Sequence, residues 1–221
     1  MLLRVEIRCP PGRAIALIGG QKDLEEGTAG MMMARLKATT RPLHEAVEAR
    51  LDLFRLTRSI EGYARALKLF YGLHDPLEGA FARLPGWDRV GLDPSERRKA
   101  HLLRADLRRL GLDEAALDAL PRCPTPPPVP DLPAALGAMY VLEGSTLGGR
   151  SIRKRVEEAL GLTPDDGCAY FSSYGDRVGP MWKAFGAAVD AFATEEEVRE
   201  SIEQSAVATF RAVDAWFADG A

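Results

Sequence analysis

The sequence has few cysteines, and none of them are spaced to bind a metal. Its three cysteines, Cys9, Cys123 and Cys168, lie far apart among 221 residues, without a Cys-x-x-Cys motif. An odd number of distant cysteines does not indicate a disulfide framework. A chain of this length can bury a core without disulfides or structural metals. We therefore expect a reducing, cytoplasmic setting.

An excess of charge and long apolar runs are also missing. The formal net charge is -3, which excludes a strongly basic nucleic-acid binder and gives no attraction to anionic membranes. No apolar run approaches the roughly 20 residues of a membrane-spanning helix, and no basic start followed by an apolar segment suggests a signal peptide. We therefore expect neither nucleic acid nor a membrane as a partner.

Residues 1–30 differ in pattern from the rest of the chain. Leu3, Val5 and Ile7 alternate with charged residues, which is the period of a strand. A lone hairpin is only marginally stable in water. We interpret residues 1–30 as a flexible or weakly docked extension, or as the product of a start codon read too far upstream. The functional domain then spans residues 31–221.

From Arg35 onward, apolar residues recur at helical spacing, as Leu43, Val47 and Leu51 do. Seven prolines between Pro121 and Pro133 predict an extended connector. The further helices expected are one capped by Ser59, one from Asp93 to about Leu110, Asp113–Leu120, Leu132–Leu160 interrupted by glycines, Val178–Ala193, and one from a capping box at Thr194 to about Phe217. This pattern predicts an all-α, single-domain helical bundle.

The chain has only three histidines. His44 lies beside the apolar stripe of its helix, where it could present an imidazole to a buried metal or be a hydrogen-bonded core or rim histidine. His74 lies near an expected helix break before Pro76 and should bond to backbone or solvent, while His101 should be exposed. No Glu-x-x-His motif is present, which argues against a di-iron carboxylate bundle.

A glycine cluster interrupts an otherwise good helix at Glu143–Gly149. Each glycine costs about 1 kcal/mol relative to alanine in a helix, and Gly144 and Gly148 share one face. The cluster either lets the backbone approach a flat ligand and bend there, or lets helices pack closely through small residues. Together with His44, it suggests a planar cofactor between two helices, and haem fits that description.

Three segments, "LKATTRPLHEAVEARL", "FYGLHDPLE" and "YVLEGSTLGGRSI", resemble the haem oxygenases, specifically the bacterial branch that includes enzymes associated with bacteriophytochromes. The resemblance spans about Met33 to the C-terminal helix, and "SSYGDRVGPMWKAF" agrees with it. It implies a haem-oxygenase-like bundle, in which haem lies between a proximal helix and a glycine-kinked distal helix.

The resemblance also implies roles for individual residues. His44 stands where the family has its proximal haem-iron ligand, and Gly144 and Gly148 fall on the distal helix over the open face of the haem. Ser145 stands where many members carry an aspartate that orders distal water. Serine is common in this branch, but the change leaves the proton-delivery route open.

Two further positions match haem-contacting residues of the family. Lys37 matches a basic residue that pairs with a haem propionate, and Tyr140 matches a tyrosine at the haem edge. Lys37 precedes His44 by seven residues, about two helical turns, so the two share a face if the helix is continuous. Pro42 could instead kink or start that helix, and a start at Pro42 would remove the geometric basis for Lys37.

The implied reaction is the opening of haem to biliverdin with release of carbon monoxide and iron, with haem as substrate and cofactor. It needs O2 and an electron donor such as a ferredoxin or a reductase, and a bacteriophytochrome could accept the biliverdin. Next to the glycines lies a basic run, which could dock an acidic donor or be a solvated helix face. It consists of Arg150, Arg153, Lys154 and Arg155.

Two other functions share parts of this pattern. A haem carrier would use the same His44 pocket and leave haem intact. An unrelated enzyme on the same scaffold, such as a thiaminase-like hydrolase, would need a nucleophilic cysteine. Cys123 in the proline connector and Cys168 in a loop have no evident activating partner in the sequence.

Overall fold

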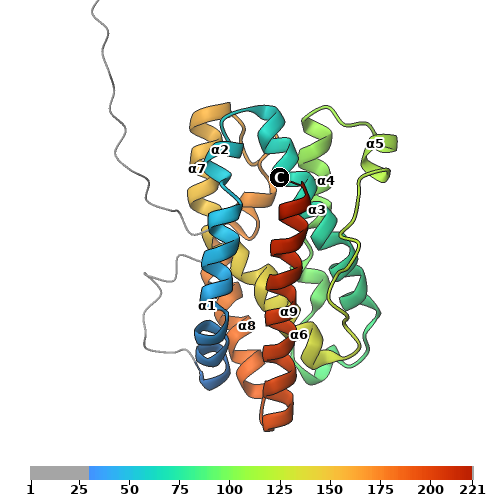
Figure 1. Ribbon diagram of the computed structural model, residues 1–221, viewed down its shortest axis with the longest axis vertical. Helices are drawn as coiled ribbons and strands as arrows, with labels where there is room; N and C mark the ends of the chain where they lie inside the picture. Colours follow the sequence, from blue (N-terminus) through green and yellow to red (C-terminus); the bar gives the residue numbers. More distant parts are fainter. Residues whose placement is uncertain (1–29, 221) are drawn as a thin grey trace, which may run out of the picture.

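The computed structural model describes residues 30–220 (Figure 1), so the extension expected before Met31 lies outside the described residues except for Gly30. The described part is helical and contains no named strand, which confirms the all-α prediction. The α-helices are α1 Met31–Arg50, α2 Leu53–Leu56, α3 Ile60–Arg83, α4 Ala100–Arg109, α5 Glu114–Asp118, α6 Leu132–Gly144, α7 Gly149–Leu160, α8 Val178–Phe192 and α9 Glu196–Gly220. Short 3-10 turns are η1 Trp87–Arg89, η2 Pro94–Arg97, η3 Ser145–Gly148, η4 Tyr170–Ser172 and η5 Gly175–Arg177.

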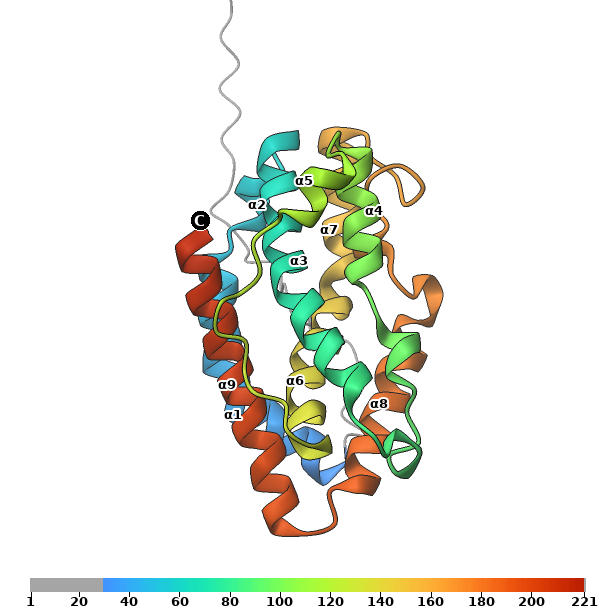
Figure 2. The same cartoon turned by 90° about the vertical axis from the view of Figure 1, so that its right-hand side faces the viewer.

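The last helix, α9, packs against both α1 and α6 (Figures 1 and 2). Its buried residues include Ile202, Phe210 and Val213, which recur on one face. Contact with α6 is close because Gly137 has no side chain: a Cβ there would lie 2.2 Å from the Ile202 carbonyl oxygen. None of the described helices is long and apolar enough to cross a membrane.

Helix α1 is continuous, with Pro42 inside it. The interpretation that the helix starts at Pro42 is therefore wrong, and Lys37 and His44 share one face. Ser59 caps α3 as predicted, because its hydroxyl accepts the backbone N–H of Gly62 at 3.1 Å.

One predicted helix is wrong. Asp93 caps only the 3-10 turn η2, and the chain breaks before α4 begins at Ala100. The reason is tertiary: the backbone N–H groups of Lys99 and Ala100 donate to the carboxylate of Glu78 on α3. This long-range contact replaces the local hydrogen bonds that a continuous helix would have made.

A second correction concerns the break expected before Pro76. Helix α3 runs through Pro76 to Arg83, so His74 lies in the middle of a helix and is buried. It bonds to side chains and not to backbone or solvent. His101, in contrast, is exposed on α4 as expected.

The proline connector is extended, as predicted, and passes between α9 and α3 (Figure 2). It is fixed to α3 where Cys123 N–H donates to the Gly72 carbonyl at 2.9 Å. Gly72 permits this contact, since a Cβ there would lie 2.8 Å from the Pro121 carbonyl oxygen. Arg122 strengthens the attachment by donating to Asp75 at 2.9 Å.

Candidate functional site

His44 is the most unusual polar residue of α1. Its Nε2 atom is the only buried side-chain nitrogen or oxygen without a hydrogen-bond partner within residues 30–220. The Glu48 carboxylate lies 3.6 Å away, which is too far for a hydrogen bond. The ring packs edge-on against Phe210 of α9, with 6.2 Å between centroids.

The surroundings of His44 favour the neutral imidazole. Desolvation by burial lowers its pKa below the usual 6.5, opposed only in part by the charge of Glu45. A neutral imidazole has a free lone pair and is the form that binds iron. Buried polar atoms in native proteins nearly always have a partner. A buried Nε2 without a hydrogen-bond partner is therefore a candidate ligand for a metal ion.

The glycine cluster forms a break between two helices. Helix α6 ends at Gly144, a 3-10 turn covers Ser145–Gly148, and α7 continues from Gly149. The hydroxyls of Ser145 and Thr146 donate to carbonyls three residues back, each at 2.7 Å, and such bonds bend helices. The predicted interruption is thus confirmed, with Gly144 and Gly148 both buried at its ends.

A cavity of about 20 Å³ is lined by residues of α1, α3, α6, η3 and α9. Val47 and Leu51 line it from α1, and Leu142 and Ser145 line it from α6 and η3. Val47 lies one turn beyond His44. The cavity has room for about one water molecule, so the helices must move apart to admit a molecule as large as haem.

Lys37 and Tyr140 lie away from this cavity, among the residues the structure describes. Lys37 is exposed on α1, while Tyr140 is buried on α6 and packs against Trp182 with 5.7 Å between ring centroids. Of the predicted site residues, only Ser145 lines this cavity; His44, Gly144 and Gly148 are also not among its lining residues.

A buried ionic cluster immediately precedes the glycines. The Glu143 carboxylate accepts from Arg97 Nη1 and Lys99 Nζ, each at 2.5 Å, and from the Tyr174 hydroxyl at 2.9 Å. Arg97, Lys99 and Glu143 are all buried. The cluster joins the end of α6 to η2 and to the segment before η5. Sequence reasoning missed it, although a glutamate directly beside Gly144 in an apolar helix was a usable signal.

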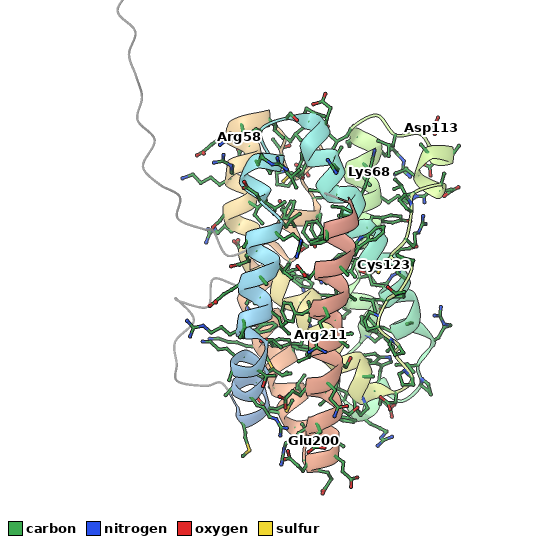
Figure 3. All side chains as sticks on the ribbon, viewed as in Figure 1. Arg58, Lys68, Asp113, Cys123, Glu200 and Arg211 are labelled. Carbon is green, nitrogen blue, oxygen red and sulfur yellow. The ribbon has the colours of Figure 1, made fainter. Side chains whose placement is uncertain are left out.

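The two described cysteines are poor nucleophiles. Burial raises the pKa of the Cys168 thiol to about 11 and also raises that of Cys123, which lies on the connector (Figure 3). Neither thiol ionises readily near neutral pH. This disfavours a cysteine-dependent hydrolase.

The basic run is only partly exposed. Arg150 and Lys154 are exposed, while Arg153 and Arg155 are half-buried on α7. Arg155 donates to the Thr57 hydroxyl at 3.2 Å. The face available to a partner is therefore smaller than the sequence suggests.

Comparison with known proteins finds a matching family and a similar solved structure. A family model described as heme oxygenase matches residues 31–219. The chain is also similar to a solved heme oxygenase from Neisseria meningitidis, determined with NO and CO bound, at 21% sequence identity and a TM-score of 0.73. That similarity covers 87% of this chain and 92% of the other, and it shows a shared fold. No curated protein sequence gives a significant match.

Proposed function

The chain belongs to the haem oxygenase family, and we propose on this basis that it opens haem to biliverdin, releasing carbon monoxide and iron. Bound haem supplies the iron at which dioxygen is reduced and the porphyrin ring that is cleaved. The protein then has to hold haem in one orientation, exclude bulk water and bring protons to the reacting side.

The observation that carries this proposal is the buried, unpartnered Nε2 of His44, which would bind the iron. Gly144 and Gly148 would let the distal backbone approach the opposite face, and Ser145 would hold water there. Lys37, exposed on the same face of the continuous α1, would pair with a haem propionate. Tyr140 would contact the haem edge.

The electron donor and the biliverdin acceptor are further proposals. Electrons would come from an acidic protein such as a ferredoxin or from a reductase, docked at the exposed Arg150 and Lys154, and the rate would then fall as salt is added. Ser145, where many members of the family have aspartate, supports the bacteriophytochrome-associated branch, with a bacteriophytochrome as biliverdin acceptor.

Turnover of hemin tests the function directly. Hemin is mixed with the protein under air with a reductant, and the Soret band and the biliverdin absorbance are followed. Loss of the Soret band with formation of biliverdin supports the oxygenase. Full hemin occupancy with a stable Soret band would instead indicate a haem carrier.

Substitution of His44 tests the ligand. His44→Ala should change the axial-ligand spectrum and lower hemin affinity by at least about tenfold, because the only proposed protein ligand is lost. His101→Ala, an exposed histidine on α4, is the control and should leave both unchanged. Identical spectra and affinity in His44→Ala and the wild type would contradict the assignment.

A further inference from the structure

Tyr174 has a backbone conformation that residues with a side chain seldom adopt. Its φ is 65°, in the left-handed region, and such a conformation persists only where the surrounding contacts enforce it. Its hydroxyl donates to the Glu143 carboxylate at 2.9 Å and accepts from Lys99 Nζ at 3.1 Å. The same Nζ lies 4.6 Å from the centre of the Tyr174 ring, which is an attractive cation–π distance. The buried ionic cluster therefore holds Tyr174 directly before η5.

Arg97 connects the first turns of α8 to the same carboxylate. Its Nη1 atom donates to Glu143 at 2.5 Å and to the Met181 carbonyl at 3.4 Å. Its guanidinium carbon lies 5.6 Å from the centre of the Phe185 ring. One carboxylate at the end of α6 is thus connected both to the residue before η5 and to α8.

Residues 173–182 lie between two firmly packed parts of the chain, and we call this stretch the η5 segment. On one side, the backbone N–H of Tyr170 donates to the buried Asp106 carboxylate at 2.8 Å. On the other side, Gly186 packs closely on α1, where an added Cβ would lie 3.3 Å from the Met33 side chain. Any movement is therefore confined to the η5 segment between these two anchors.

The η5 segment has few other attachments. Among residues 30–220, the hydrogen bonds that reach it from distant parts of the chain are those of Tyr174 and Met181 to the ionic cluster. An added Cβ at Gly175 or Gly179 would meet no atom within 4 Å, so open space surrounds the backbone there. Without the cluster contacts, apolar packing alone holds the segment in place.

The η5 segment borders the proposed haem site. Helix α8 lies next to α1, α6 and η3 (Figure 1), the elements that carry His44, Tyr140 and the glycine cluster. Trp182, at the end of the segment, packs against Tyr140 with 5.7 Å between ring centroids. Glu143 directly precedes Gly144, so its contacts join the segment to the point where the distal turn begins.

We propose that Glu143, Lys99 and Tyr174 form a latch that keeps the η5 segment closed against the distal turn, and that its release opens the pocket for haem to enter and for biliverdin to leave. The proposal rests on the proposed oxygenase function, because both molecules are far larger than the cavity of about 20 Å³. The three residues position a wall of the pocket and take no part in the chemistry.

Such a latch has a kinetic signature. A contact that stabilises the closed form equally with and without haem slows entry and exit alike. Its loss therefore raises the association and dissociation rates together and leaves the affinity nearly unchanged. A residue that only supports the fold would, when altered, weaken hemin binding through faster dissociation alone.

Two tyrosines provide a matched test. Tyr174→Phe removes the latch hydroxyl and keeps the ring. Tyr71→Phe, the control, removes a hydroxyl that accepts from Arg122 of the proline connector at 3.1 Å. Stopped-flow mixing with hemin and transfer of bound hemin to excess apomyoglobin measure the two rates. Both should rise by at least about tenfold in Tyr174→Phe, because its hydroxyl bonds to a charged group, and stay within about twofold in Tyr71→Phe.

Hydrogen exchange in the haem-free protein gives a second readout. In Tyr174→Phe, the amides of the η5 segment should exchange at least about tenfold faster than in the wild type, while those of α9 keep their wild-type rates. Local opening exposes little surface, so wild-type exchange in the segment should be insensitive to low urea concentrations, unlike that of α9. This wild-type measurement decides the proposal even if Tyr174→Phe does not fold.

The outcomes separate the latch from the function. Wild-type exchange of the η5 segment only by global unfolding, unchanged exchange in Tyr174→Phe, or a lower hemin affinity at an unchanged association rate would each overturn the latch and leave the oxygenase function standing. A wild-type protein that binds hemin without degrading it would overturn the function, and the exchange and binding rates would still decide the latch.

Discussion

At the scale of single residues, buried charge dominates the energetics around the site. Glu143 accepts from two cations that are themselves buried, Arg97 and Lys99. Removing one partner of such a group leaves an uncompensated charge out of water, which costs far more than the intact pair contributes. Tyr174 is the one described residue other than glycine with a positive φ, at 65°. Its hydroxyl donates to the Glu143 carboxylate of this cluster.

The first prediction concerns Lys99. Lys99→Met should lower the free energy of unfolding by about 3–5 kcal/mol, because Glu143 loses one of its two cations. Lys154→Met is the control, since Lys154 is exposed and only 3.8 Å from Glu158, and it should change stability by less than about 0.5 kcal/mol. Urea unfolding measures both, and equal values would contradict the role of the cluster.

The second prediction concerns acid sensitivity through Glu78. Its pKa is lowered from 4.5 in the folded state, so its stabilising effect is complete above pH 4.5 and is lost as the pH falls through the lower folded-state value. Glu78→Gln should cost about 1–3 kcal/mol at neutral pH, and the difference from the wild type should shrink below pH 4.5. Urea unfolding across pH 3–7 measures it; a difference that grows toward acid would refute the sign.

At the scale of elements, helix contacts depend on a few positions without side chains. The third prediction is that Gly137→Ala destabilises the fold by about 1–3 kcal/mol or more, because the new Cβ would lie 2.2 Å from the Ile202 carbonyl oxygen. Gly179→Ala, in a helix with nothing within 4 Å of the new Cβ, should be neutral or stabilise by up to about 1 kcal/mol. Thermal unfolding compares the two, and equal melting temperatures would argue against close α6–α9 contact.

The sequence predicts most elements and few of their tertiary partners. Caps such as Ser59 and Asp113 act within one turn, so local rules find them, as they find the break at Gly144 and Gly148. The helix expected from Asp93 to about Leu110 is wrong because Glu78, on another helix, captures the backbone N–H groups of Lys99 and Ala100. Local sequence patterns cannot predict a contact between residues on two different helices.

The candidate site shows the same division. His44 and Ser145 could be singled out from spacing and resemblance, because each lies in a short distinctive segment. The environment of His74 could not be inferred, since Tyr170 is 96 positions away along the chain. Its partners become visible only when η4 is folded against α3.

At the scale of the whole molecule, the small cavity has a kinetic consequence. A volume of about 20 Å³ cannot admit haem unless the elements that line it, α1, α3, α6, η3 and α9, move apart. The 3-10 turn η3 has poorer hydrogen-bond geometry than the α-helices that it joins. Binding that waits for an opening step proceeds at a rate set by that step when ligand is abundant.

The fourth prediction follows from this opening. In stopped-flow mixing, the observed rate of hemin binding should reach a plateau as hemin concentration rises. Gly148→Ala should lower the plateau, because alanine favours a regular helix by about 1 kcal/mol, whereas Gly179→Ala should not. A rate that rises linearly over the whole range would show that the pocket is already open.

The position of α9 also bears on biosynthesis. Helix α9 packs against α1 and α6, lines the cavity with Val213 and Phe217, and is the last helix to leave the ribosome. Until residues 196–220 have emerged, the faces of α1 and α6 that α9 covers stay exposed and the cavity lacks one of its walls. The cavity is therefore completed only after translation, and chaperones would protect the waiting chain.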